Sequence, residues 1–135
     1  MADGFGAKKI CCGMSETLHL PLKAQWYSMI ESGVKTEEYR EIKAYWVQRL
    51  CVWSDGGKIC KSDAEFLASN ISYLISAIEE GEILFVNCTY VKFSYGYTHR
   101  TMTFNIESIT IGKGNPEWGA PDKEVFVIKL GRRGA

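Results

Sequence analysis

The amino-acid sequence predicts an α+β fold in which most strands of the sheet run antiparallel. Strand-like and helix-like segments follow in the order β-α-β-α-α-β-β-β, which alternates too little for a doubly wound parallel sheet. The last three strand-like segments are separated by turn-sized gaps, which favours antiparallel neighbours in a sheet or a small barrel. The chain has 135 residues, of which 46% are hydrophobic, so one packed domain is expected.

The chain opens with residues 1–16, a stretch with several glycines and little periodicity that we interpret as a flexible leader. Residues 17–23 then alternate apolar and polar side chains, the pattern of a half-buried strand. The apolar positions are Leu18, Leu20 and Leu22. Pro21 has no amide hydrogen to donate to a neighbouring strand, so we expect this strand at an edge of the sheet.

Residues 24–33 change to helical spacing, and Gly33 suits the position just after a helix end. Residues 35–42 follow as a second predicted strand. Strict alternation divides its side chains between two faces, with Thr36, Glu38 and Arg40 on one and Lys35, Glu37 and Tyr39 on the other. Residues 44–51 predict a short helix, and its packing residues would be Tyr45, Trp46 and Leu50.

Residues 62–80 carry the clearest helical pattern in the chain. Ser62 and Glu65 match a capping box, and Gly81 suits the helix end. The apolar stripe consists of Leu67, Ile71, Leu74, Ile75 and Ile78. Acidic residues outnumber basic ones in this part of the chain, so we expect an acidic outer face.

The last third of the chain predicts three strands, over residues 83–95, 100–111 and 124–130. In the middle strand the apolar residues alternate with polar ones, and the alternation slips once. The apolar residues are Met102, Phe104, Ile106 and Ile109. A glycine- and proline-rich loop precedes the last strand. Residues 132–135 are interpreted as a polar tail.

Composition excludes several classes of function. Lys and Arg number 16 and Asp and Glu also number 16, so the basic excess that binds long duplex nucleic acid is absent. Five cysteines without a C-x-x-C pair and two histidines assemble no zinc spacing, and no cofactor is expected. No apolar stretch is long enough for a membrane span, so we expect a cytoplasmic protein with reduced thiols and no membrane partner.

The candidate motif is Gly33-x-Lys35-x-x-Glu38-x-Arg40. Glu38 and Arg40 are two residues apart on a predicted strand, so both side chains leave the same face. Arg offers a planar fork of donors to a phosphate, a carboxylate or a base edge, and Glu offers an acceptor pair or a proton. The alternative is a solvated strand whose ion pairs contribute little.

Three aromatic or basic positions near loops are weaker candidates. Tyr95 and Arg100 flank a predicted turn and could stack on a base, although tyrosines there also pack on neighbours. Trp118 lies in the loop before the last strand, where it is either a core anchor or a stacking platform.

The segment "LHLPLKAQWYSMIESGVKTEEYREIKAYWVQRL", with its G-x-K-x-x-E-x-R pattern, resembles the start of an ASCH domain, a branch of the PUA-like superfamily. Residues 83–131 resemble the second half of a small bacterial or phage-type member. The resemblance implies a mixed, mostly antiparallel β-barrel with flanking helices over residues 17–131. The segment of about 55–81, with one helix, would be an insertion.

For function, the resemblance implies binding of RNA, a nucleotide or a modified nucleoside in a cleft beside the first helix. The cleft would be lined by Lys23, Lys35, Glu38, Arg40, Tyr95, Arg100 and Trp118. One branch of the family is an amidohydrolase that deacetylates N4-acetylcytidine with a Lys and a Thr three residues later. Lys35 matches that Lys, but Glu38 replaces the Thr, so a binding module is favoured over an enzyme.

Two alternatives to a binding module remain open. One is a metal-independent amidohydrolase acting on an N-acylated pyrimidine nucleoside. In it Lys35 would stabilise an oxyanion and Glu38 would activate water. The family's further Glu has no motif match in this chain, and Glu117 is chosen by position alone. The other is a protein-interaction module acting through the acidic helix at 62–80. Oligomeric state is left open.

Overall fold

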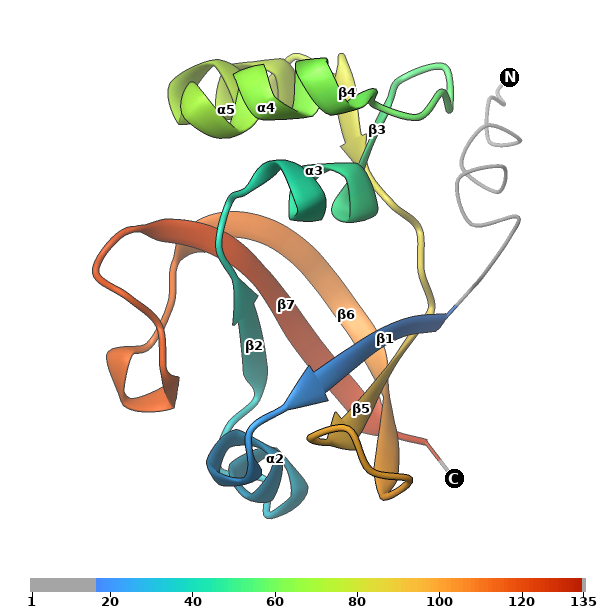
Figure 1. Ribbon diagram of the computed structural model, residues 1–135, viewed down its shortest axis with the longest axis vertical. Coiled ribbons are helices and arrows are strands. Elements are labelled where there is room, and N and C mark those ends of the chain that lie inside the picture. Colours follow the sequence, from blue (N-terminus) through green and yellow to red (C-terminus); the bar gives the residue numbers. More distant parts are fainter. Residues whose placement is uncertain (1–16, 135) are drawn as a thin grey trace. The chain divides into compact units, whose positions relative to one another are not determined.

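The computed structural model describes residues 17–134, so the predicted leader at 1–16 lies outside the described residues. The chain divides into two compact units (Figure 1). The sheet unit comprises residues 17–40 and 88–134, and the helical unit comprises residues 41–87. The segment predicted as an insertion, about 55–81, lies inside the helical unit, which already begins at residue 41.

The sheet unit is built on one five-stranded sheet with the order β1-β5-β6-β7-β2. The strands are β1 (Thr17–Leu22), β2 (Glu37–Arg40), β5 (Tyr90–Tyr95), β6 (Thr101–Lys113) and β7 (Glu124–Arg133). β1 runs parallel to β5, whereas the other three pairs are antiparallel. The predicted mixed, mostly antiparallel sheet is therefore confirmed, and it curls into a half-barrel whose two edges are β1 and β2 (Figure 1).

The alternation in β1 places its leucines in the core. Leu18, Leu20 and Leu22 are buried, while Pro21 between them is exposed. As predicted, β1 is an edge strand, where a residue without an amide hydrogen interrupts no ladder. The core beneath it includes Val91, Phe93, Phe126 and Ile128, all inaccessible to solvent.

β6 carries the predicted slip in its alternation. Its register against β7 shifts between Phe104 and Ile106 and again between Ile106 and Ser108. Such bulges add local twist and bend a strand, which suits the curl of this sheet. β7 continues to Arg133, so the prediction of a tail from residue 132 is wrong, because Arg133 still pairs with Phe104.

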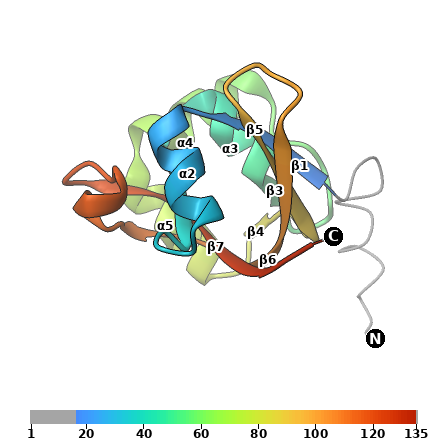
Figure 2. The ribbon, with the colours of Figure 1, turned by 90° about the horizontal axis from the view of Figure 1, so that it is seen from below.

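The helix α2 (Ala24–Glu31) connects the edge strands β1 and β2. Tyr27 and Ile30 form its buried face, and Gly33 follows its end with a φ of 89°. This is the left-handed conformation that favours glycine after a helix. In Figure 2, α2 lies in front of the sheet, between the β5–β6 turn and the loop that precedes β7.

The helical unit contains α3 (Ala44–Leu50), α4 (Lys61–Ser69) and α5 (Ile71–Glu79) with a two-stranded sheet. That sheet pairs β3 (Cys51–Trp53) antiparallel with β4 (Ile83–Phe85). The single strand predicted over 83–95 is therefore wrong, since its first part pairs with β3 and its last part forms β5. Tyr45 is exposed and Val47 is buried on α3, which corrects the packing assigned to Tyr45.

The helix predicted over 62–80 is two helices that meet at Asn70. The Asn70 side chain donates a hydrogen bond to the Phe66 carbonyl at 2.8 Å, so it competes with the helical backbone pattern. The helix also begins one residue earlier than predicted, after Cys60, which makes no side-chain cap. Ser62 thus lies inside the first turn, and its hydroxyl is 3.3 Å from the Cys60 sulfur rather than in a capping box. No helix within residues 17–134 is long and apolar enough to cross a membrane.

Candidate functional site

Lys35 is 1% exposed, although it follows directly on the exposed turn after α2. Its amide donates to the Met29 carbonyl at 3.0 Å, which turns the chain back under the helix. We predicted Lys35 and Glu38 on opposite faces of one strand, and this is wrong. β2 begins only at Glu37, so strand alternation does not extend to Lys35.

The Lys35 ammonium group is surrounded by polar and aromatic partners. Its Nζ donates to the Trp118 carbonyl at 2.8 Å and lies 3.1 Å from the Glu38 carboxylate. It also lies 4.6 Å from the centre of the Tyr39 ring and 5.4 Å from that of Trp26, within the range of cation–π attraction. These contacts replace the water that the ammonium loses on burial.

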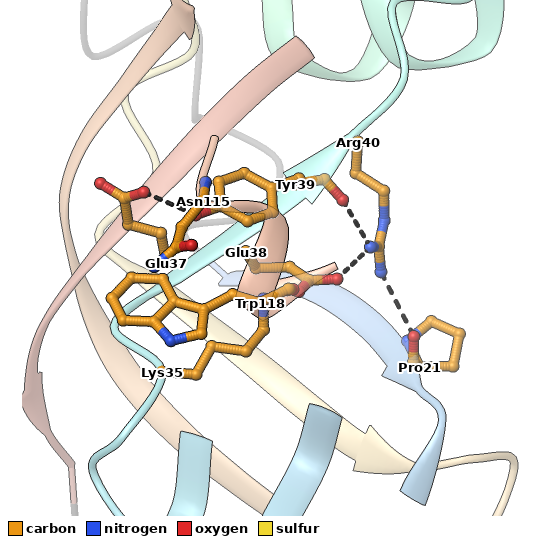
Figure 3. A network of polar contacts seen from close by, with 8 residues as sticks. All are labelled: Pro21, Lys35, Glu37, Glu38, Tyr39, Arg40, Asn115 and Trp118. Atoms are coloured by element: carbon orange, nitrogen blue, oxygen red, sulfur yellow. Dashed lines mark hydrogen bonds and ion pairs between the residues drawn. The ribbon is translucent and has the colours of Figure 1, made fainter. Parts of the chain in front are cut away.

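Glu38 links the two cations of the motif (Figure 3). One carboxylate oxygen contacts Lys35 and the other accepts a hydrogen bond from Arg40. The Glu38 and Arg40 side chains are 7% and 17% exposed, so Arg40 is the most accessible member of the group. We call Lys35, Glu38 and Arg40 the charge cluster.

Arg40 also connects the two edge strands of the half-barrel by a side-chain hydrogen bond. Its guanidinium donates to the Tyr39 carbonyl at 2.9 Å and to the Pro21 carbonyl at 3.2 Å (Figure 3). Arg40 lies on β2 and Pro21 on β1, the two edges of the sheet that do not pair with each other. The charge cluster therefore sits where the sheet is open, beside the helix that connects those edges.

The charge cluster combines two cations with one carboxylate, and the nearby Glu37 carboxylate also acts on Lys35. Burial lowers the pKa of Lys35 below its usual value of 10.5, and the Glu38 carboxylate opposes that shift. Lys35 is thus a buried amine that gives up its proton more readily than an exposed lysine.

Tyr39 fixes the loop before β7 to this site. Its hydroxyl donates to Glu37 at 2.8 Å and accepts from the amide of Asn115 at 3.0 Å. Burial raises the pKa of Tyr39 to about 12, so the hydroxyl stays protonated over the physiological range. A Cβ at Gly114 would come within 2.4 Å of the Tyr39 ring, so this close approach requires glycine.

The same loop presents the Trp118 carbonyl to Lys35. Asn115 accepts a hydrogen bond from the Glu117 amide at 2.9 Å and so caps the short helix η2 (Pro116–Trp118). The Trp118 side chain is partly buried against a core cluster of Tyr39, Ala120, Val125 and Val127. Of the two interpretations of Trp118, the ring therefore acts as a core anchor, and the backbone contacts the charge cluster.

The contacts found for the other predicted site residues are with groups outside the charge cluster. Arg100 pairs with Glu31 at 2.9 Å and lies over the rings of Tyr27 and Tyr95, at 5.1 and 4.9 Å. Lys23 is exposed at the start of α2 and makes no side-chain cap. Glu117 is exposed on η2.

Trp26, Tyr39 and Asn115 are not among the site residues predicted from the sequence. Trp26 lies in a segment with helical spacing, and strand alternation places Tyr39 on the other face from Glu38. The Asn115-Pro116 pair is a turn signal that pointed to the loop, but the sequence contains nothing that places this loop against α2. Within residues 17–134, no group of three or more His, Cys, Asp or Glu side chains could hold a metal ion.

Comparison of the chain with protein-family models, with curated proteins and with solved structures finds no match.

Proposed function

We propose that the sheet unit is an ASCH-type, PUA-like domain that binds a base of RNA, a nucleotide or a modified nucleoside beside α2. The resemblance of residues 17–52 and 83–131 to that family supplies the ligand class. The half-barrel, with a helix connecting its two edge strands, is compatible with the proposed fold. Both the PUA-like fold class and the ligand are therefore proposed here.

The observation that carries the proposal is the burial of Lys35 and Glu38 at the open seam of the sheet. They are 1% and 5% exposed, and they are the only charged residues among the buried ones in the described part of the chain. Burying charges costs free energy that apolar residues of the same size would avoid, so a buried ion pair is weak support for stability alone. Charged groups with shifted pKa values gather instead at binding and catalytic sites.

The donor and acceptor arrangement fits the edge of a base. Lys35 donates to the Trp118 carbonyl, and a base carbonyl oxygen that took the place of this acceptor would meet the same ammonium. Glu38 offers carboxylate oxygens to an exocyclic amino group, while Arg40, the most exposed member, faces the phosphate or sugar side. Trp26 and Tyr39 supply aromatic surfaces next to Lys35.

The contact between Lys35 and Glu38 also supports a second candidate function, hydrolysis of an N-acylated pyrimidine nucleoside. An amine whose pKa is lowered by burial, 3.1 Å from a carboxylate, can exchange a proton with it. In that reaction Glu38 would activate water and Lys35 would stabilise the oxyanion. The binding function is preferred because Glu38 stands where the deacetylating branch of the family has its Thr.

Isothermal titration with cytidine, N4-acetylcytidine and cytidine monophosphate tests the binding proposal. Wild type should bind at least one of the three, and Arg40→Ala should weaken that binding at least ten-fold. Arg49→Ala is the matched control, because Arg49 is an exposed arginine of the helical unit that contacts Tyr45. Undetectable binding of all three by the wild type, or equal binding by Arg40→Ala, contradicts the proposal.

Ultraviolet absorbance tests the second candidate. Incubation with N4-acetylcytidine should convert it to cytidine at a rate that Glu38→Gln abolishes. The Glu117→Gln variant determines whether this exposed carboxylate takes part. Absence of turnover at high protein concentration removes hydrolysis and leaves the binding proposal untouched.

A further inference from the structure

The outward face of β1, β5 and β6 is polar and lies apart from the charge cluster. Register places His19 beside Lys92 and Lys92 beside Thr103, one residue from each strand. The neighbouring positions along β1 and β5, such as Leu18 and Val91, are buried in the core. Because strand side chains alternate between faces, the row through Lys92 points away from the core.

Two cavities lie along this face. The larger has a volume of about 620 Å³, and its lining includes Lys92, Thr103, Asn105, Arg132 and Arg133. The smaller has a volume of about 300 Å³ and extends to Pro21 and His99. Both are lined by His19 and Lys92, so together they form one trough, which we call the outer trough.

The outer trough is cationic. Lys92, Arg132 and Arg133 line it, and no Asp or Glu is among the described residues that line either cavity. None of the three cations forms an ion pair with a carboxylate in the described part of the chain, but the Arg133 guanidinium lies 6.0 Å from the centre of the ring of Phe104, a core residue. In a chain of zero formal net charge, this is a local concentration of positive charge without internal compensation.

An aromatic ring and several neutral hydrogen-bonding groups complete the outer trough. Tyr90 lines the larger cavity and is 39% exposed. Thr17, Thr103 and Asn105 lie around it. A free polyphosphate would use the cations but not the ring, whereas a single-stranded nucleic acid uses both, through phosphates and stacked bases.

We propose that the outer trough binds a short segment of single-stranded nucleic acid. Lys92 and Arg132 contact phosphates, and Tyr90 stacks on a base. The lining of the smaller cavity includes Pro21, whose carbonyl accepts a hydrogen bond from Arg40. A strand in the outer trough would therefore lie near the charge cluster, although its binding does not depend on the proposed nucleoside site.

The test is fluorescence anisotropy of a labelled eight-nucleotide RNA and DNA at several salt concentrations. Lys92→Gln/Arg132→Gln removes two phosphate contacts, so the slope of log affinity against log salt should fall by about 1.4. The same relation gives a loss of about 25-fold at about 0.1 M salt. The double variant Lys58→Gln/Lys61→Gln removes two exposed charges from the helical unit and should bind as wild type does.

Three further variants distinguish the phosphate contacts, the stacking ring and the nucleoside site from one another. Arg132→Lys keeps the charge and should stay within a few-fold of wild type, whereas Tyr90→Leu should weaken binding of the oligonucleotide but not of inorganic polyphosphate. Arg40→Ala should lower nucleoside affinity while leaving oligonucleotide affinity within a few-fold. Unchanged binding by Lys92→Gln/Arg132→Gln, or equal affinity for duplex and single strand, overturns the inference even if the nucleoside site is real.

Discussion

Glu38→Gln is the sharpest test of the charge cluster, because it removes one charge and almost no volume. In the wild type the carboxylate contacts Lys35 at 3.1 Å and accepts from Arg40. The substitution leaves a 1% exposed ammonium without its counter-charge. Removing one partner of a buried pair costs about 3–5 kcal/mol. We expect a loss near the lower end of that range at neutral pH, since Lys35 keeps the Trp118 carbonyl and two aromatic rings.

The pH dependence of this loss identifies its cause. The folded-state pKa of Lys35 lies below 10.5, so the buried charge of Lys35 lowers the free energy of unfolding fully at low pH. This destabilisation decreases as pH rises through the folded-state pKa, where Lys35 loses its proton. Without Glu38, which raises this pKa in the wild type, the decrease begins at a lower pH. The difference in unfolding free energy between Glu38→Gln and wild type should therefore shrink between neutral pH and pH 10.5.

Urea unfolding followed by tryptophan fluorescence measures the effect at both pH values. Glu31→Gln is the matched control, because Glu31 also pairs with an arginine of the sheet unit but is 35% exposed. It should cost no more than about 1 kcal/mol. Replacing both partners, in Lys35→Met/Glu38→Leu, should recover most of the lost stability. A Glu38→Gln loss as small as that of the control, or one that does not change with pH, would refute the assignment of a buried charge.

Three further predictions concern the surroundings of the site and the thiols. Gly119→Ala should lower the free energy of unfolding by more than about 1 kcal/mol. Gly119 has a φ of 96°, and a Cβ there would lie 2.8 Å from an indole carbon of Trp26 on α2. Gly112→Ala is the control, because a Cβ at Gly112 meets no atom within 4 Å. Tyr39→Phe should cost about 1–3 kcal/mol in urea unfolding by leaving the loop amide without an acceptor. Since burial raises the pKa of Tyr39 to about 12, wild-type stability should fall as pH rises above 10.0, and less so in Tyr39→Phe; an equal fall contradicts the assignment. Burial raises the pKa of Cys51 to about 12, so iodoacetamide at pH 8 should label exposed Cys60 and spare Cys51, as peptide mass mapping would show.

Sequence periodicity predicted which residues are buried where burial depends only on the alternation of side chains along one strand. The leucines of β1 and the slipped alternation of β6 were predicted because side chains alternate along any strand. The spacing of Lys35, Glu38 and Arg40 also singled out the charge cluster, together with the family resemblance. By contrast, the helix break at Asn70 depends on a single side-chain hydrogen bond to Phe66, which helical periodicity does not record.

What the sequence by itself determined, then, is the α+β class, the edge position of β1 and the polar motif after α2. Only the tertiary structure decided that Lys35 and Glu38 meet, because the chain before β2 turns under the helix and is not a strand. It also decided that a backbone carbonyl, at Trp118, is the partner of the lysine, 83 residues away along the chain. Partners so distant in sequence are brought together by sheet closure and loop packing, and neither leaves a local pattern in the residues it joins.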